Sequence, residues 1–143
     1  MNLLNKNIVD FINKNQIATV CFTNELNQPY CMSCFYCFIE DSAILIFKSS
    51  YGTSHDSFIK KNNYLAGTIT GEQIDLTKLK GIQFKGKLID EQEINNKRLN
   101  FFYIKKYPLS IAIPGYLWGV QLEYVKFTDN TMGFGNKTIW EFE

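Results

Sequence analysis

The chain has 143 residues, of which 45% are hydrophobic and 20% charged, a composition typical of a folded globular protein and unlike that of a disordered chain. Its formal net charge is +1, and Arg98 is the only arginine among fifteen basic residues, so nucleic-acid binding is not expected. The length suits one domain over residues 1–143.

No membrane contact is expected from the distribution of apolar residues. The apolar runs are too short to span a bilayer. The first sixteen residues mix asparagine, lysine and aspartate with apolar residues, and they lack the basic segment and apolar core of a signal peptide. The sequence therefore predicts a cytoplasmic protein.

An amphipathic helix of about three turns is predicted first, because Leu4, Ile8, Phe11 and Ile12 recur at helical spacing. β-branched and aromatic segments separated by short turns then favour an antiparallel meander. Before residue 90 the strands are expected at 17–23, 29–39, 43–48, 64–70 and 79–89, with a helix ending near residue 62 after the third strand. Gly81 and Gly86 in the fifth strand suggest a bulge or a close backbone approach.

The second half begins with a third predicted helix, which Asp90 and Glu93 open as a capping box and Pro108 ends. A last strand follows at 117–128, and alternation places Tyr124 on the same face as Trp118. The tail beyond it is expected to be ordered by packing of its aromatic side chains. Six antiparallel strands with about three flanking helices indicate an α+β domain whose sheet can close into a six-stranded barrel.

Three of the four cysteines form a C-x2-C-x2-C pattern that resembles part of an iron–sulfur ligand run. The surrounding segment is rich in aromatic residues and predicted as a strand, so Cys31 and Cys37 would lie on one face and Cys34 on the other. Three thiolates arranged in this way cannot converge on one metal ion. Small buried hydrophobic residues are therefore the favoured interpretation, for Cys21 as well, over an iron–sulfur or zinc site.

The most informative segment is the hydroxyl-rich turn KSSYGTSH, residues 48–55, which joins the third strand to a helix start. A helix N-terminus has unpaired N–H groups and a partial positive charge, both of which favour a bound phosphate. Thr53 followed by Asp56 is equally the pattern of an ordinary capping box, which local rules favour. Six side chains would contribute hydroxyl donors or charge to a phosphate pocket: Lys48, Ser49, Ser50, Thr53, Ser54 and His55.

The order of these elements resembles that of the pyridoxamine 5'-phosphate oxidase-like superfamily of FMN-binding split barrels. The likeness is greatest to an uncharacterised bacterial branch of that superfamily, and it is carried by FYCF near Phe35, GIQFKG from Gly81 and KFTDNTMGFGNKTIW from Lys126. This resemblance implies a homodimer with FMN at the subunit interface. The phosphate would bind the turn after the third strand, which reverses the preference for a plain helix cap.

The resemblance also implies particular contacts. Ser49 and Ser50 correspond to the residues at the strand end that meet the flavin phosphate, and Ser54 and His55 correspond to a serine and a basic residue at the helix start. Thr53 and Lys48 are further candidates at the phosphate. The backbone of the second strand at Met32, Ser33 and Cys34 would lie along the flavin ring. Gln83 could contact the flavin or its substrate. His55 could donate to phosphate, shuttle a proton or lie in solvent.

Two departures from the family pattern affect the expected chemistry. His55 and Asp56 stand where the oxidase has an arginine–lysine pair, so the pocket has less positive charge, and the arginine-rich substrate site has no counterpart. We therefore predict a flavin-dependent oxidoreductase acting on a small molecule other than pyridoxamine phosphate, without an identifiable catalytic side chain. The alternative is a noncatalytic protein that binds FMN, another phosphorylated ligand or haem.

Overall fold

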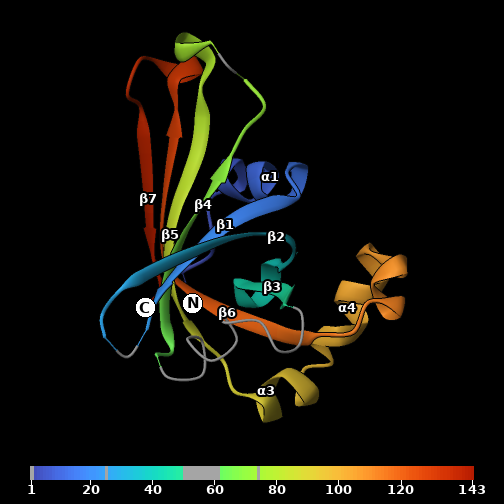
Figure 1. The fold of residues 1–143 in the computed structure, drawn as a ribbon. Coiled ribbons are helices and arrows are strands. Elements are labelled where there is room, and N and C mark those ends of the chain that lie inside the picture. Colours follow the sequence, from blue (N-terminus) through green and yellow to red (C-terminus); the bar gives the residue numbers. More distant parts are fainter. Residues whose placement is uncertain (1, 25, 50–61, 74) are drawn as a thin grey trace.

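The computed structural model describes residues 2–24, 26–49, 62–73 and 75–143. Their strands form one antiparallel sheet in the order β3-β2-β1-β4-β5-β6-β7, and an additional pairing of β3 with β6 closes the first six strands into a barrel (Figure 1). The predicted six-stranded α+β split barrel is thereby confirmed. The predicted helix that ends near residue 62 falls largely on residues 50–61, outside the described part of the chain.

The strands agree closely with the predicted ones, apart from a seventh strand in the tail. They are β1 (Ile17–Thr23), β2 (Pro29–Ile39), β3 (Ile44–Ser49), β4 (Tyr64–Thr70), β5 (Lys80–Leu88), β6 (Tyr116–Asp129) and β7 (Lys137–Glu141). β7 pairs with β6 outside the closed barrel, and it buries Trp140 against the core. The tail is therefore ordered, as predicted, through backbone pairing as well as aromatic packing.

The described residues also contain three α-helices and four short 3-10 helices. These are α1 (Lys6–Lys14), α3 (Glu91–Asn96), α4 (Leu99–Lys106), η1 (Glu40–Ser42), η2 (Leu76–Lys78), η3 (Pro108–Ala112) and η4 (Asn130–Met132). None of them is long and apolar enough to cross a membrane. The apolar face of α1 joins the barrel core, where the Tyr36 hydroxyl donates a 2.6 Å hydrogen bond to the Ile12 carbonyl.

The structure has two helices where the sequence predicted one between Asp90 and Pro108. The Asp90 side chain caps α3 by accepting from the Glu93 N–H, as predicted, but the helix breaks at Arg98, which has a left-handed φ of 53°. In one continuous helix Ile94 and Leu99 would point about 140° apart. The break allows both side chains to pack in the same buried cluster, against Ile44 and Ile46 on the outer side of β3.

A β-bulge in β6 overturns the predicted position of Tyr124. β5 pairs Lys85 with Tyr124 but Gly86 with Leu122, so Glu123 is the extra residue. Beyond the bulge the alternation is reversed. Leu122 consequently faces the core, whereas Tyr124 lies on the outer face beside Lys85.

Candidate functional site

β2 and β3 separate part-way along their length. They pair only between Tyr36–Ile39 and Ile44–Phe47. The first part of β2 pairs with β1, whereas the end of β3 continues along β6, with Lys48 opposite Leu117 and Ser49 opposite Tyr116. We call the opening bordered by β2 residues 31–35 and by the end of β3 the split.

The register of β1 and β2 determines which backbone groups face the split. The Tyr36 N–H donates to the opposing Gln16 carbonyl at 3.0 Å, so this is a hydrogen-bonded pair. Such pairs alternate with pairs whose backbone groups point away from each other. The N–H and carbonyl groups of Ser33 and Phe35 therefore point away from β1 and toward the split.

Two tyrosines of the α4–η3 region cover one end of this edge. The Tyr103 hydroxyl donates to the Phe35 carbonyl at 3.2 Å, and the Tyr107 hydroxyl donates to the Tyr36 carbonyl at 2.5 Å. No described residue bonds to the N–H of Ser33, which leaves a backbone donor at the split. Sequence reasoning missed both tyrosines; the available signal was their i, i+4 spacing, which places them on one helix face.

Lys48 and Ser49 at the end of β3 are held by neighbouring elements. The Lys48 ammonium donates to the Ser110 carbonyl at 2.8 Å, and the buried Ser49 hydroxyl accepts from the Trp118 indole N–H at 2.6 Å. The Ser110 hydroxyl is buried and has no hydrogen-bond partner in the described part of the chain. The strand end therefore combines a positive charge with two hydroxyl groups.

Strand alternation separates the three β2 residues that were predicted to contact the flavin ring into core-facing and outward-facing ones. Cys34 is buried in the barrel core, and Met32 packs against that core. Their backbone groups belong to hydrogen-bonded pairs with β1. Of the three predicted residues, only Ser33 is exposed and also presents its backbone to the split. The predicted phosphate ligands Ser50, Thr53, Ser54 and His55 lie outside the described residues.

Gln83 is far from the split within one chain. A row of paired residues runs across the outer face from Ser33 through Thr19 and Thr68 to Gln83. These three strand-to-strand steps separate Ser33 from Gln83 by about 14 Å. The structure thus brings Ser33, Lys48 and Ser49 to the same opening but places Gln83 elsewhere.

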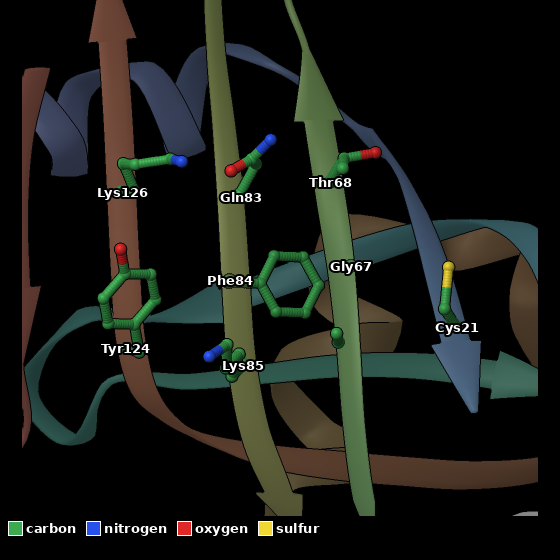
Figure 2. Close-up of a pocket in the computed structure, with 9 residues that line it drawn as sticks. Cys21, Gly67, Thr68, Gln83, Phe84, Lys85, Tyr124 and Lys126 are labelled. Carbon is green, nitrogen blue, oxygen red and sulfur yellow. The ribbon is translucent and has the colours of Figure 1, made fainter. Parts of the chain in front are cut away.

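Gln83 instead lines a hollow of about 400 Å³ on the outer face of β4, β5 and β6. Figure 2 shows Lys85, Tyr124 and Lys126 around it, with the small residue Gly67 on β4. The Lys85 ammonium lies 5.2 Å from the centre of the Tyr124 ring, which is a cation–π contact. Lys85 has this partner because the bulge in β6 brings Tyr124 to the outer face.

The shifted pKa values of the tyrosines beside the split lead us to predict that the free energy of unfolding decreases at high pH. Burial raises the pKa values of Tyr36 and Tyr107, and burial together with Cys34 and Cys37 raises the pKa of Tyr103 to about 12. The unfolded chain loses these protons near pH 10, at the ordinary tyrosine pKa. Because the unfolded state then binds fewer protons, stability is complete below about pH 10 and decreases as the pH rises to about 12.

This pH dependence is measurable from urea unfolding midpoints and tyrosinate absorbance between pH 8 and 12. We expect Tyr36, Tyr103 and the half-buried Tyr107 to ionise together with unfolding, and Tyr103→Phe to reduce the slope of stability against pH. Ionisation of all the tyrosines near pH 10 in a chain that stays folded would contradict the role of burial.

No family model matches the chain. A UPF0306 protein of Photorhabdus laumondii is 34% identical over 131 residues, which cover 92% of this chain and 91% of the relative. The chain belongs to the UPF0306 family. This membership confirms the predicted resemblance to a bacterial branch without an assigned activity, and similarity over nine-tenths of both chains means that the relationship includes the strands that border the split.

Solved structures show that this UPF0306 chain shares its fold with ligand-binding split barrels. A pyridoxamine 5'-phosphate oxidase-related FMN-binding protein from Nostoc punctiforme has a TM-score of 0.74 at 10% identity, with 100% of this chain and 92% of that chain covered. A haem-binding protein from Mycobacterium smegmatis has a TM-score of 0.72 at 11% identity, with coverage of 92% and 55%.

Proposed function

We propose that the protein binds FMN and acts as a flavin-dependent oxidoreductase on a small molecule other than pyridoxamine phosphate. The observation that carries the proposal is the split, where an edge of β2 that pairs with no described strand lies next to the charged and hydroxyl-bearing end of β3. Arg98 is the only arginine, and it lies between α3 and α4, so an arginine-rich site for pyridoxamine phosphate cannot form.

The described residues of the split fit a flavin. The Ser33 and Phe35 N–H groups would donate to the ring heteroatoms, because they point away from β1. Lys48 and Ser49 would contact the phosphate side, and the buried Ser110 hydroxyl beside Lys48, which has no hydrogen-bond partner among the described residues, supports a polar ligand there. When bound, FMN supplies the redox chemistry, and the chain holds and orients it.

A homodimer with FMN at the subunit interface follows from the same proposal. Gln83 lies about 14 Å from Ser33 across three strand steps. A second copy that placed its outer face over the split would bring Gln83, Lys85 and Lys126 to the cofactor. The two lysines would add positive charge near the phosphate turn, where this sequence has His55 and Asp56 in place of the oxidase's arginine–lysine pair.

A noncatalytic binding protein for FMN, another phosphorylated ligand or haem is the second candidate. The split favours it in one respect, because the side chains described there are apolar groups, hydroxyls, thiols and one lysine, and they include no carboxylate or imidazole that would act as a general acid or base. The likeness to a haem-binding barrel supports haem as the other ligand.

Purification without added ligand tests the proposal. We expect a yellow protein with a flavin spectrum, or a colourless one that binds added FMN with one equivalent per chain. A Soret band would favour the haem-binding alternative. A colourless, folded protein that fails to bind FMN would overturn the proposed function.

The turn outside the described residues allows a separate test of the phosphate position. Replacing Thr53 and Ser54 together by alanine is expected to weaken FMN binding more than it lowers the melting temperature of the ligand-free protein, because the hydroxyl donors are lost. Loss of stability with unchanged FMN affinity would mean that the turn is only a helix cap.

A further inference from the structure

Cys21 on β1 and Cys31 on β2 face each other directly across the barrel wall. They are register partners, and their sulfur atoms lie 2.9 Å apart. Cys31 is exposed to solvent and Cys21 is half-buried. The prediction that all the cysteines are small buried hydrophobic residues is therefore wrong for this pair.

The other two cysteines behave as that prediction expected. Cys34 is buried in the barrel core and Cys37 in the cluster outside β3. Each thiol donates to a carbonyl, that of Ala18 or of Phe102, and not to another cysteine. Burial raises the pKa of Cys34 to about 12. The chain thus has one facing pair of thiols, and it is the pair at the surface.

The backbone positions of Cys21 and Cys31 suit a disulfide. Because Tyr36 and Gln16 form a hydrogen-bonded pair, alternation along the ladder makes the Cys31–Cys21 pair a non-hydrogen-bonded one. In such pairs the Cα atoms are about 4.5 Å apart and the side chains are closest, which is within the range that a disulfide spans. Rotation of the side chains alone can bring the two sulfur atoms to bonding distance.

In the single chain, before a second copy covers the outer face, a small reagent has access to this pair from that face. Cys21 lines the hollow that contains Gln83, and it also lines an adjoining hollow of about 560 Å³ that shares Ala66 and Lys85 with the first. The neighbour of Cys21 on β4 is Ala66, whose methyl group leaves the sulfur uncovered on that side.

We propose that Cys21 and Cys31 form a thiol–disulfide exchange site for low-molecular-weight disulfides. The Cys31 thiolate attacks one sulfur of the small disulfide, whose S–S bond breaks and releases the first small thiolate. Cys21 then gives its proton to solvent, and its sulfur attacks the Cys31 sulfur of the mixed disulfide and expels the second small thiolate. The two protein thiols are oxidised to a disulfide, and the small disulfide is reduced to two thiols.

The order of the two attacks follows from the surroundings of each sulfur. Cys31 is the exposed member and meets the reagent first. Burial, with the hydrogen bond to Cys31, raises the pKa of Cys21 to about 11, so few Cys21 thiolates form near neutral pH. Once Cys31 carries the mixed disulfide, the Cys31 sulfur lies beside the Cys21 sulfur. This proximity speeds the second attack and compensates for the small amount of Cys21 thiolate.

Incubation of the folded protein with oxidised glutathione tests this site. We expect the wild type to lose two of its four thiols and two hydrogen atoms in mass, with no adduct retained and a Cys21–Cys31 link in the peptide map. In the Cys21→Ser variant the reaction should stop at the mixed disulfide, with one glutathione attached to Cys31. Cys31→Ser should react about tenfold more slowly than Cys21→Ser, because the smaller thiolate fraction of Cys21 is only partly offset by its greater nucleophilicity.

Several results would overturn the proposal. A wild type that keeps four thiols in oxidised glutathione has no thiol that attacks the reagent. A wild type that retains a stable glutathione adduct has no second thiol that resolves the mixed disulfide. A link that involves Cys34 or Cys37, or that joins two chains, assigns the reactivity to other sulfur atoms. The wild-type mass and peptide map decide these outcomes without any variant, and circular dichroism confirms that the oxidised chain is folded.

Discussion

Gly86→Ala is expected to destabilise the protein by about 2–3 kcal/mol, which is typical of adding a methyl group to a filled site. A Cβ at this position would collide with the Gln121 carbonyl oxygen and would lie 2.6 Å from a Val120 methyl carbon. The Gln121 carbonyl belongs to the backbone beside the β6 bulge, so it cannot move aside without disturbing the pairing of β5 and β6.

Gly81 in the same strand provides the matched control. A Cβ there would meet only the Ile69 carbonyl oxygen, at the ordinary contact distance of 3.6 Å. Gly81→Ala should therefore change the free energy of unfolding by no more than about 0.5 kcal/mol. Urea unfolding of both variants measures the difference. Equal destabilisation by the two substitutions would mean that the cost comes from strand conformation and not from the close approach at Gly86.

These two glycines illustrate how far the fold could be predicted. Side-chain alternation and turn residues located six strands, because a strand with one buried face leaves a period of two in the sequence. No local pattern distinguishes Gly86 from Gly81, since a close approach depends on which part of β6 lies opposite. The bulge or close approach suggested by Gly86 is confirmed, since the pairing shifts between Lys85 and Gly86. The position of the extra residue, Glu123 on β6, and the break at Arg98 were not predicted, because both depend on packing between elements distant in the chain.

The candidate site was predictable to a similar extent. Lys48 and Ser49 could be placed at the end of a strand, and Ser33 on the strand before it. The register between β1 and β2 is not readable from either segment alone, yet it determines that the Ser33 backbone faces the split and that Cys21 meets Cys31. The strand assignment could separate Cys31 from Cys34, but it could not supply the cross-strand partner.

Ser33→Pro is expected to weaken FMN binding about tenfold, the equivalent of one hydrogen bond. Proline removes the Ser33 N–H, which points to the split, and leaves the hydrogen bonds between β1 and β2 intact, since the Ser33–Thr19 pair is a non-hydrogen-bonded one. Edge strands tolerate proline where the missing N–H faces outward. The variant should therefore fold, as circular dichroism can establish, and show its defect in an FMN titration.

Ser33→Ala separates the backbone from the side chain in this experiment. Alanine keeps the N–H and removes only the exposed hydroxyl, so its FMN affinity should stay within about twofold of the wild type. Equal weakening by proline and alanine would assign the contact to the hydroxyl. Normal FMN binding by the proline variant would remove the β2 edge from the cofactor site and leave the end of β3 and the phosphate turn as its remaining determinants. A dependence on the N–H alone would explain why this site carries so little signature in its side chains, because its ligand would be held largely by backbone groups that any residue except proline can supply.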